Sequence, residues 1–165
     1  MEPIFFTRRN VMSSVASVFS VVGMTTMFSE KVFAKGNDPI QKLNRDGKPA
    51  DGTQMITPLV IHNGLIYIAG QGANSNGPVG KDDIDSHTTK VMENVKQLVE
   101  VGGGGMDSIL QLTVFLADLA HYDAMNKIFK TYFPHGGPAR TTVAAAGLPG
   151  NSLIEINCIA AITRK

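Results

Sequence analysis

Residues 138–160, which read PARTTVAAAGLPGNSLIEINCIA, decide the fold expected of this chain. They predict two apolar β-strands, 140–146 and 153–163, joined by a turn rich in Gly and Pro. The only charges in this stretch are Arg140 and Glu155. Charged groups on two neighbouring apolar strands are costly unless they pair or serve a ligand. Spacing alone leaves two interpretations open: an ion pair at a subunit interface, or a site for a small anion at Arg140 with chemistry near Glu155.

Alternation assigns the two faces of the last strand. Glu155 shares one face with Asn157 and Ile159, and we expect this face to point away from the helices. The opposite face should pack under the helices because it is wholly apolar, with Ile154, Ile156, Cys158, Ala160 and Ile162. Cys158 is the single Cys, so we predict a buried hydrophobe and exclude an internal disulfide and a Cys-based metal site.

Upstream of this stretch, the pattern predicts the order ββαβαββ. Asn-Gly between two short apolar runs is a strong hairpin signal, and apolar spacing of three and four residues predicts two amphipathic helices. The remaining expected elements are strands 58–62, 65–69 and 108–116 and helices 85–101 and 120–133. The fold class is therefore α+β, with a mixed sheet and both helices packed on one face.

Several local motifs have a structural and a functional interpretation. Gly70-Gln71-Gly72 either lets a ligand carboxylate approach the backbone or forms a turn with a bulge at the strand end. The four glycines at 102–105 follow a helix and lack a Lys-Ser/Thr pair, which favours a turn over a phosphate loop. Asp118 is expected to cap a helix rather than act as a base. The histidines show no metal spacing and are expected at the surface: His62, His87, His121 and His135.

The first 34 residues predict an export signal. Arg8 and Arg9 stand in the pattern TRRNVM, an apolar run rich in Ser and Thr follows, and Val32-Phe33-Ala34 suits a cleavage site. We therefore expect a twin-arginine-type signal at 1–34, an irregular lead-in at 35–52, a domain at 53–165 and a periplasmic location. Without its signal the chain has 12 basic and 12 acidic residues. This balance, without a basic run, argues against nucleic-acid binding. The Ser and Thr residues dilute the apolar run below an ordinary spanning helix, so we expect no stable membrane association after cleavage.

The chain from about 57 to 164 resembles the RidA family, also called YjgF/YER057c/UK114, of enamine/imine deaminases. The resemblance is carried by the combination of several segments rather than by any single one. They are NGLIYIAGQ at 63–71, Asn94-Val95, LTVFLADL at 112–119, 122–133 with Asn126, PARTTV at 138–143, Leu148-Pro149, IEI at 154–156 and Ile159-Ala160.

The resemblance implies a chorismate-mutase-like fold and a homotrimeric barrel with a cleft between each pair of subunits. It implies that Arg140 grips the substrate carboxylate, that Glu155 positions or activates a water, and that backbone near Gly70 lines the cleft. The expected substrate-binding residues are Gly70, Gln71, Asn126, Arg140 and Thr142. The implied reaction is hydrolysis of 2-imino or enamine acids to 2-oxo acids and ammonia, without a cofactor or metal.

Two positions depart from the family pattern. Leu59 follows Pro58 where the best-known members have a Tyr, which should make that side of the cleft more apolar. Thr142 stands two residues after Arg140, where they have a Cys, and keeps a hydroxyl on the same strand face.

The alternative function is a trimeric binding module for a small carboxylate, although such a module has no evident need for Glu155. Ribonuclease activity finds no support in the balanced charge.

Overall fold

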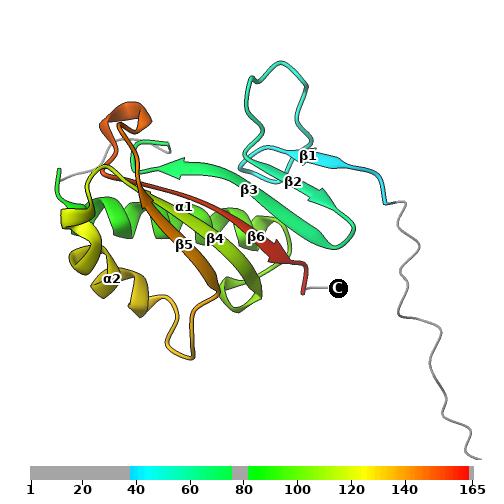
Figure 1. The fold of residues 1–165 in the computed structure, drawn as a ribbon. Helices are drawn as coiled ribbons and strands as arrows, with labels where there is room; N and C mark the ends of the chain where they lie inside the picture. The colour runs from blue at the N-terminus through cyan, green and yellow to red at the C-terminus, as the bar shows by residue number, and fades with distance from the viewer. Residues whose placement is uncertain (1–37, 76–81, 164–165) are drawn as a thin grey trace, which may run out of the picture. The chain divides into compact units, whose positions relative to one another are not determined.

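The computed structural model describes residues 38–75 and 82–163, all within the unit Lys35–Lys165. One six-stranded sheet has the order β1-β2-β3-β6-β4-β5, and it is mixed because β4 and β5 are parallel while the other neighbours are antiparallel (Figure 1). The strands are β1 (Gln41–Leu43), β2 (Leu59–His62), β3 (Leu65–Gly72), β4 (Ile109–Leu116), β5 (Ala139–Ala144) and β6 (Ile154–Ala161).

The predicted hairpin is confirmed between β2 and β3. Asn63 and Gly64 both adopt positive φ angles, 51° and 75°, which the Asn-Gly pair tolerates and the tight turn requires. Further along β3 the pairing with β6 shifts register between Ile68 and Gln71. A bulge, one of the two interpretations of Gly70-Gln71-Gly72, is therefore present.

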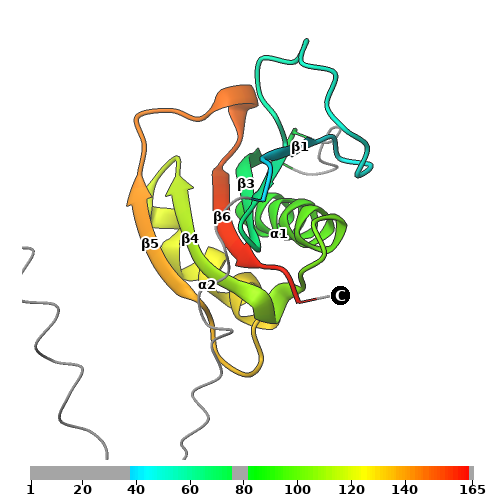
Figure 2. The same cartoon turned by 90° about the vertical axis from the view of Figure 1, so that its right-hand side faces the viewer.

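Both helices lie on one face of the sheet, as expected (Figure 2). They are α1 (Ile84–Val101) and α2 (Tyr122–Thr131). The helix α1 begins where Asp83 accepts a hydrogen bond from the Ser86 amide, and it ends at Gly102. Asp118 likewise accepts from the Ala120 amide at 2.8 Å, which confirms its structural role before α2.

The core lies between this helix layer and the sheet. The predicted inner face of β6 is confirmed for Ile154, Ile156, Cys158 and Ala160, which are each at most 3% exposed. It is wrong for Ile162, which follows the end of β6 and is 37% exposed. The four buried residues pack with buried residues of α1 and β4, and burying each of the two Ile side chains in this way contributes about 1.5–3 kcal/mol.

Two expectations are wrong. The segment 35–52 is not wholly irregular, because Gln41–Leu43 pair with β2 and add a sixth strand to the five expected. His87 is not at the surface: it is 1% exposed, accepts from the Leu153 amide through Nδ1 and contacts Asp82 through Nε2. Backbone pairing over three residues and a histidine's packing partners are both invisible to local periodicity.

The predicted signal at 1–34 lies outside the described residues. Within the part that is described, neither helix is long and apolar enough to cross a membrane.

Candidate functional site

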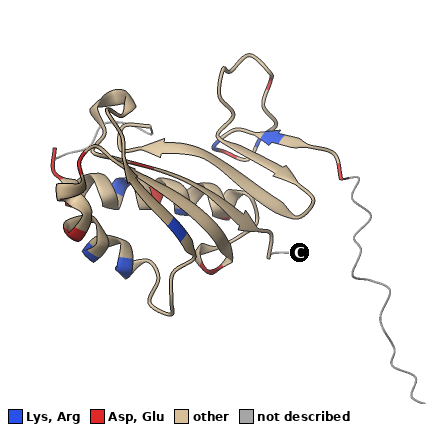
Figure 3. Cartoon of the chain, viewed as in Figure 1, with Lys and Arg blue, Asp and Glu red and all other residues tan. Residues whose placement is uncertain are grey.

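Charge is sparse on the sheet. Across β2 to β6, Arg140 on β5 and Glu155 on β6 are the only Lys, Arg, Asp or Glu residues, and Figure 3 shows the rest of these strands without charge. Two ion pairs form among the described residues, Lys48–Asp46 and His87–Asp82. Neither Arg140 nor Glu155 takes part in one, so nothing described neutralises either charge.

The two strands are not neighbours, because β4 lies between them. This corrects the expectation of adjacent strands. Arg140 is level with Leu112, which pairs with Cys158, whereas Glu155 is level with Phe115, which pairs with Val143. Paired residues share a face of a sheet. Arg140 therefore lies on the helix side, and Glu155 lies on the open side, as the alternation predicts for Glu155.

The guanidinium of Arg140 is held by two aromatic side chains of α2. Its central carbon lies 4.7 Å from the centre of the Phe129 ring and 5.8 Å from that of Tyr122. Its Nη2 also donates a 3.3 Å hydrogen bond to the Tyr122 hydroxyl. Aromatic faces attract cations without neutralising them. The group is thus fixed in direction, half-buried, and still able to bind a carboxylate with its remaining N–H groups.

In the sequence, Tyr122 and Phe129 stand out only by their helical spacing within the helix expected at 120–133. The signal that could have found them is the combination of two periodicities. They lie seven residues apart on one face of α2, and Arg140 lies on the strand face that this helix covers. Asn126 falls between them on the same helix face and is half-buried. The prediction that Asn126 binds substrate is therefore compatible with its position near Arg140.

Thr142 lies on the same face as Arg140, as predicted. Its hydroxyl oxygen is buried and has no hydrogen-bond partner among the described residues. Buried hydroxyls are normally paired, because an unpaired one costs about 1–3 kcal/mol. The hydroxyl of Thr142 thus lacks a hydrogen-bond partner, and the guanidinium of Arg140 lacks an acidic one, among the described residues. A polar, anionic ligand bound on this side of β5 could supply both.

The carboxylate of Glu155 lies directly over Gly70. A Cβ atom built at Gly70 would meet Oε1 of Glu155 and lie 3.0 Å from its carboxyl carbon. Only glycine leaves this space free, and the φ angle of Gly70 is not in the left-handed region. A side chain at this position would therefore displace the Glu155 carboxylate rather than strain the backbone. Gly70 provides the floor on which the Glu155 carboxylate rests.

Two predicted contributors do not reach a surface. Gln71 is 2% exposed, and its amide donates to the carbonyls of Ala69 and Gly70 at 2.7 and 3.2 Å. Its side chain is thus occupied within the fold. Leu59 is fully buried and pairs with Ile68 in the core, so it does not line a cleft in the subunit. The expectation that Leu59 makes the cleft more apolar is wrong.

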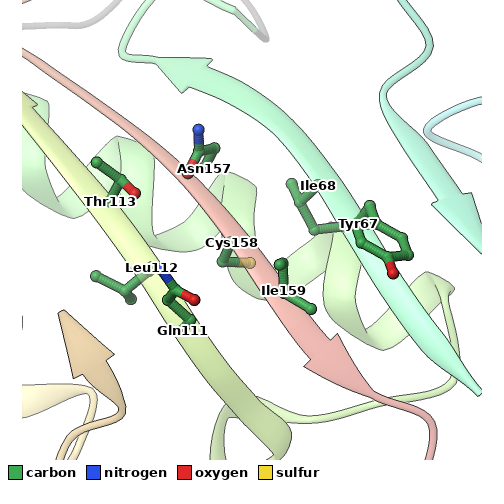
Figure 4. A pocket seen from close by; sticks show the side chains of 8 residues that line it. All are labelled: Tyr67, Ile68, Gln111, Leu112, Thr113, Asn157, Cys158 and Ile159. Atoms are coloured by element: carbon green, nitrogen blue, oxygen red, sulfur yellow. The ribbon is translucent and has the colours of Figure 1, made fainter. Parts of the chain in front are cut away.

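The open face of the sheet carries a shallow hollow of about 250 Å³ (Figure 4). Its lining is uncharged and mixes polar with apolar groups, and on the open side it includes Tyr67, Gln111, Thr113, Asn157 and Ile159. Nothing in it attracts an anion strongly. It is better suited to contact another neutral surface than to bind a charged metabolite.

The thiol of Cys158 is buried on the helix side, and burial raises its pKa to about 12. It is therefore protonated at neutral pH and is a poor nucleophile. Within residues 38–75 and 82–163, His, Cys, Asp and Glu side chains form no group of three that could hold a metal ion.

The architecture and the matched sequence define the class of protein. The model of the family "Endoribonuclease L-PSP" matches residues 48–162. The chain belongs to this family, that of the YjgF and RidA proteins.

Known relatives agree in sequence and in fold. Over 102 residues the chain is 33% identical to Reactive Intermediate Deaminase A, chloroplastic, of Arabidopsis thaliana, a match that covers 61% of this chain but only 54% of that protein. The crystal structure of YEO7_yeast superimposes with a TM-score of 0.68 at 28% identity, covering 76% of this chain and all of that one. The E. coli protein TdcF, solved with bound serine, gives 0.62 at 25% identity, covering 74% and 98%.

Proposed function

We propose that this protein is a deaminase that hydrolyses 2-imino acids, and their enamine tautomers, to 2-oxo acids and ammonia. The observation that carries the proposal is the state of Arg140. Its guanidinium is oriented by Phe129 and Tyr122 and has no acidic partner among the described residues. A planar cation held in this way is suited to a bidentate contact with a carboxylate.

The active site is formed between two subunits. Within one chain, Arg140 and Glu155 lie on opposite faces of a continuous hydrogen-bonded sheet and two strand positions apart. Two strand spacings amount to about 10 Å, so a molecule of amino-acid size cannot contact both groups of the same chain. If both act on one substrate, Arg140 comes from one subunit and Glu155 from the next. A homotrimeric barrel meets this requirement, because the open faces then meet around a common axis.

The reaction needs little beyond positioning. Arg140 binds the carboxylate, with the Thr142 hydroxyl and Asn126 on the same side. A water held by Glu155 loses a proton to the Glu155 carboxylate as the water oxygen bonds to the imine carbon. The nitrogen takes this proton from Glu155 to give a carbinolamine. The carbinolamine hydroxyl then loses its proton to Glu155 as the C=O bond forms, the nitrogen takes up this second proton as the C–N bond breaks, and ammonia leaves a 2-oxo acid. Because imino acids already hydrolyse in water, holding the reactants together supplies much of the rate enhancement.

The similarity to a protein named Reactive Intermediate Deaminase A supports the proposal. So does the serine bound to TdcF, because serine carries an amino group and a carboxylate. The rival is a binding module that holds a carboxylate without turnover. Glu155 favours catalysis over simple binding. A carboxylate beside a bound anion repels it and weakens binding, so its presence suits a role in the reaction better than a role in binding. Gly70 also leaves open the space that this carboxylate occupies.

The activity is tested with imines generated in place by an amino-acid oxidase. The purified protein is added and the formation of 2-oxo acid is followed against the spontaneous rate. An acceleration that Glu155→Gln abolishes and Glu100→Gln retains supports the proposal, because Glu100 lies exposed on α1. Tight binding of a 2-oxo or amino acid without any acceleration would instead identify a binding module.

The shared site is tested by complementation. Subunits carrying Arg140→Ala and subunits carrying Glu155→Gln are co-expressed with different tags, and the mixed assemblies are purified through both tags. If each site takes one residue from each of two subunits in a closed ring, every mixed trimer recovers about one site in three. Complete inactivity of mixed trimers would show that both residues come from one subunit, and a stable monomer in light scattering would exclude the arrangement.

We also propose that the protein acts in the periplasm after export by the twin-arginine route. The motif at Arg8 and Arg9 motivates this proposal. The double change Arg8→Lys and Arg9→Lys should leave the unprocessed protein in the cytoplasm, which fractionation and mass spectrometry detect. Normal processing of the double variant would indicate another route.

A further inference from the structure

Arg45 lies in the turn that follows β1, outside the residues that the family model matches. Its Nη2 donates to Oε1 of Gln71 on β3. Arg45 is half-buried, and this burial lowers its pKa. It takes part in neither of the ion pairs formed among the described residues. Placing a partly desolvated cation against a neutral amide is costly, which calls for a role for this contact.

The amide of Gln71 holds the bulge of β3. Its nitrogen donates to the carbonyl oxygens of Ala69 and Gly70, at 2.7 and 3.2 Å, within the register shift between β3 and β6. An amide has one acceptor end and one donor end. The hydrogen bond from Arg45 fixes Oε1, and the nitrogen must then face the two carbonyls. A rotated amide would place its oxygen against both of them.

The bulge in turn supports Glu155. The carboxylate of Glu155 lies where a Cβ at Gly70 would lie. A small movement of the Gly70 backbone therefore changes the space that is open to this carboxylate. Three steps of direct contact thus lead from Arg45, through Gln71 and the Gly70 peptide, to Glu155. None of them involves Arg140, which lies on the other face at the opposite edge of the sheet.

We propose that Arg45 and Gln71 are positioning residues of the deaminase site, which hold the Gly70 backbone where the Glu155 carboxylate needs it. The inference rests on the proposed function. It gives the lead-in before β2 a part in catalysis. A purely structural clamp, which ties this lead-in to the sheet, is the competing interpretation.

The test uses the full chain with Arg45→Met, Gln71→Met and both changes together. Misplacement of Glu155 should lower kcat about 10- to 100-fold, while KM stays within about twofold because binding through Arg140 is untouched. The double variant should lose no more than the worse single one, since both changes break the same series of contacts. Lys48→Met is the matched control, because Lys48 is exposed and pairs only with the neighbouring Asp46.

Arg45→Lys keeps a charged donor, so it should recover part of kcat and should fold even if Arg45→Met does not. A clamp that is only structural would lower the melting temperature and leave kcat of the folded fraction unchanged, and this result would overturn the inference.

A crystal structure of Arg45→Met tests the inference without turnover. A displaced Gly70 peptide with a displaced Glu155 carboxylate supports it, and an unchanged bulge overturns it. If the wild-type protein accelerates no imine hydrolysis, the proposed function fails, and this structure still decides whether Arg45 positions Glu155. If the wild type is active and Arg45→Met and Arg45→Lys both keep kcat, only the positioning role fails.

Discussion

Arg140 and Glu155 are the two charged residues of strands β2 to β6, and their side chains are positioned by opposite means. Arg140 is oriented by large side chains, because Phe129 and Tyr122 of α2 lie against its guanidinium. Glu155 is accommodated by the lack of a side chain, because Gly70 leaves open the space that its carboxylate fills. One is on the helix face at an edge strand, and the other is on the open face two strands away.

This difference predicts how each position responds to mutation. The Arg140 side consists of attractive contacts that can be weakened in steps, so its variants should change substrate binding gradually. The Glu155 side depends on free volume, so a single added methyl group should act almost as strongly as a change of the acid itself. The following experiments test this contrast, from the largest expected effect to the smallest.

Arg140→Lys keeps the charge and loses the planar fork that matches a carboxylate. Losing a charge-assisted bidentate contact should cost about 2–4 kcal/mol of transition-state binding, which is about 30- to 1000-fold in kcat/KM. Steady-state kinetics on imines formed in place measure this loss, and Lys127→Arg on the exposed face of α2 serves as the control. If the variant loses its assembly while the folded protein keeps full activity, Arg140 belongs to an interface ion pair instead.

Gly70→Ala should lower kcat about 10- to 100-fold by displacing the Glu155 carboxylate. Stability should change little, because the atom nearest to the new methyl group is the end of a flexible side chain. Gly105→Ala is the matched control, since a Cβ there meets nothing within 4 Å and the φ angle of −157° suits any residue. Full activity of Gly70→Ala would contradict the volume argument and separate Glu155 from the chemistry.

The same contrast explains what could be predicted from the sequence. The face of Glu155, the hairpin at Asn63-Gly64 and the apolar inner face of β6 follow from local periodicity, and the structure confirms each of them. The order of strands does not follow from it. Whether β5 pairs with β6 or with β4 is decided by contacts distant in the sequence, and this is why Arg140 and Glu155 were wrongly expected on adjacent strands.

Side-chain partners were also beyond local pattern. Gln71 belongs to a segment that carries the family resemblance, yet its amide is used inside the bulge rather than at a surface. Leu59 was placed in the cleft by its position after Pro58, but its pairing with Ile68 puts it in the core. A motif therefore assigns these residues to strands, whereas the direction of each side chain depends on register and on the bulge.

Phe129→Leu should weaken the orientation of Arg140 without removing its charge. A cation–π contact is worth about 0.5–2 kcal/mol, so kcat/KM should fall about 2- to 30-fold, mainly through KM. Phe133→Leu is the matched control for stability, because Phe133 is equally buried and its ring lies 4.8 Å from that of Phe129. Equal kinetic losses in the two variants would mean that general loosening of α2, rather than the ring over Arg140, is responsible.

Thr142→Val should change activity least of these variants, and it should change stability and activity in opposite directions. The two side chains have nearly the same shape, and the hydroxyl oxygen of Thr142 is buried without a partner among the described residues. Removing an unpaired buried polar group should raise the free energy of unfolding by about 1 kcal/mol, which chemical denaturation measures. Activity should nevertheless fall a few-fold if the hydroxyl contacts substrate or water beside Arg140. Thr141→Val, on the open face of the same strand, should show neither effect. A more stable variant with unchanged kinetics would show that the hydroxyl does not serve the ligand and would leave Arg140 as the polar group of that side.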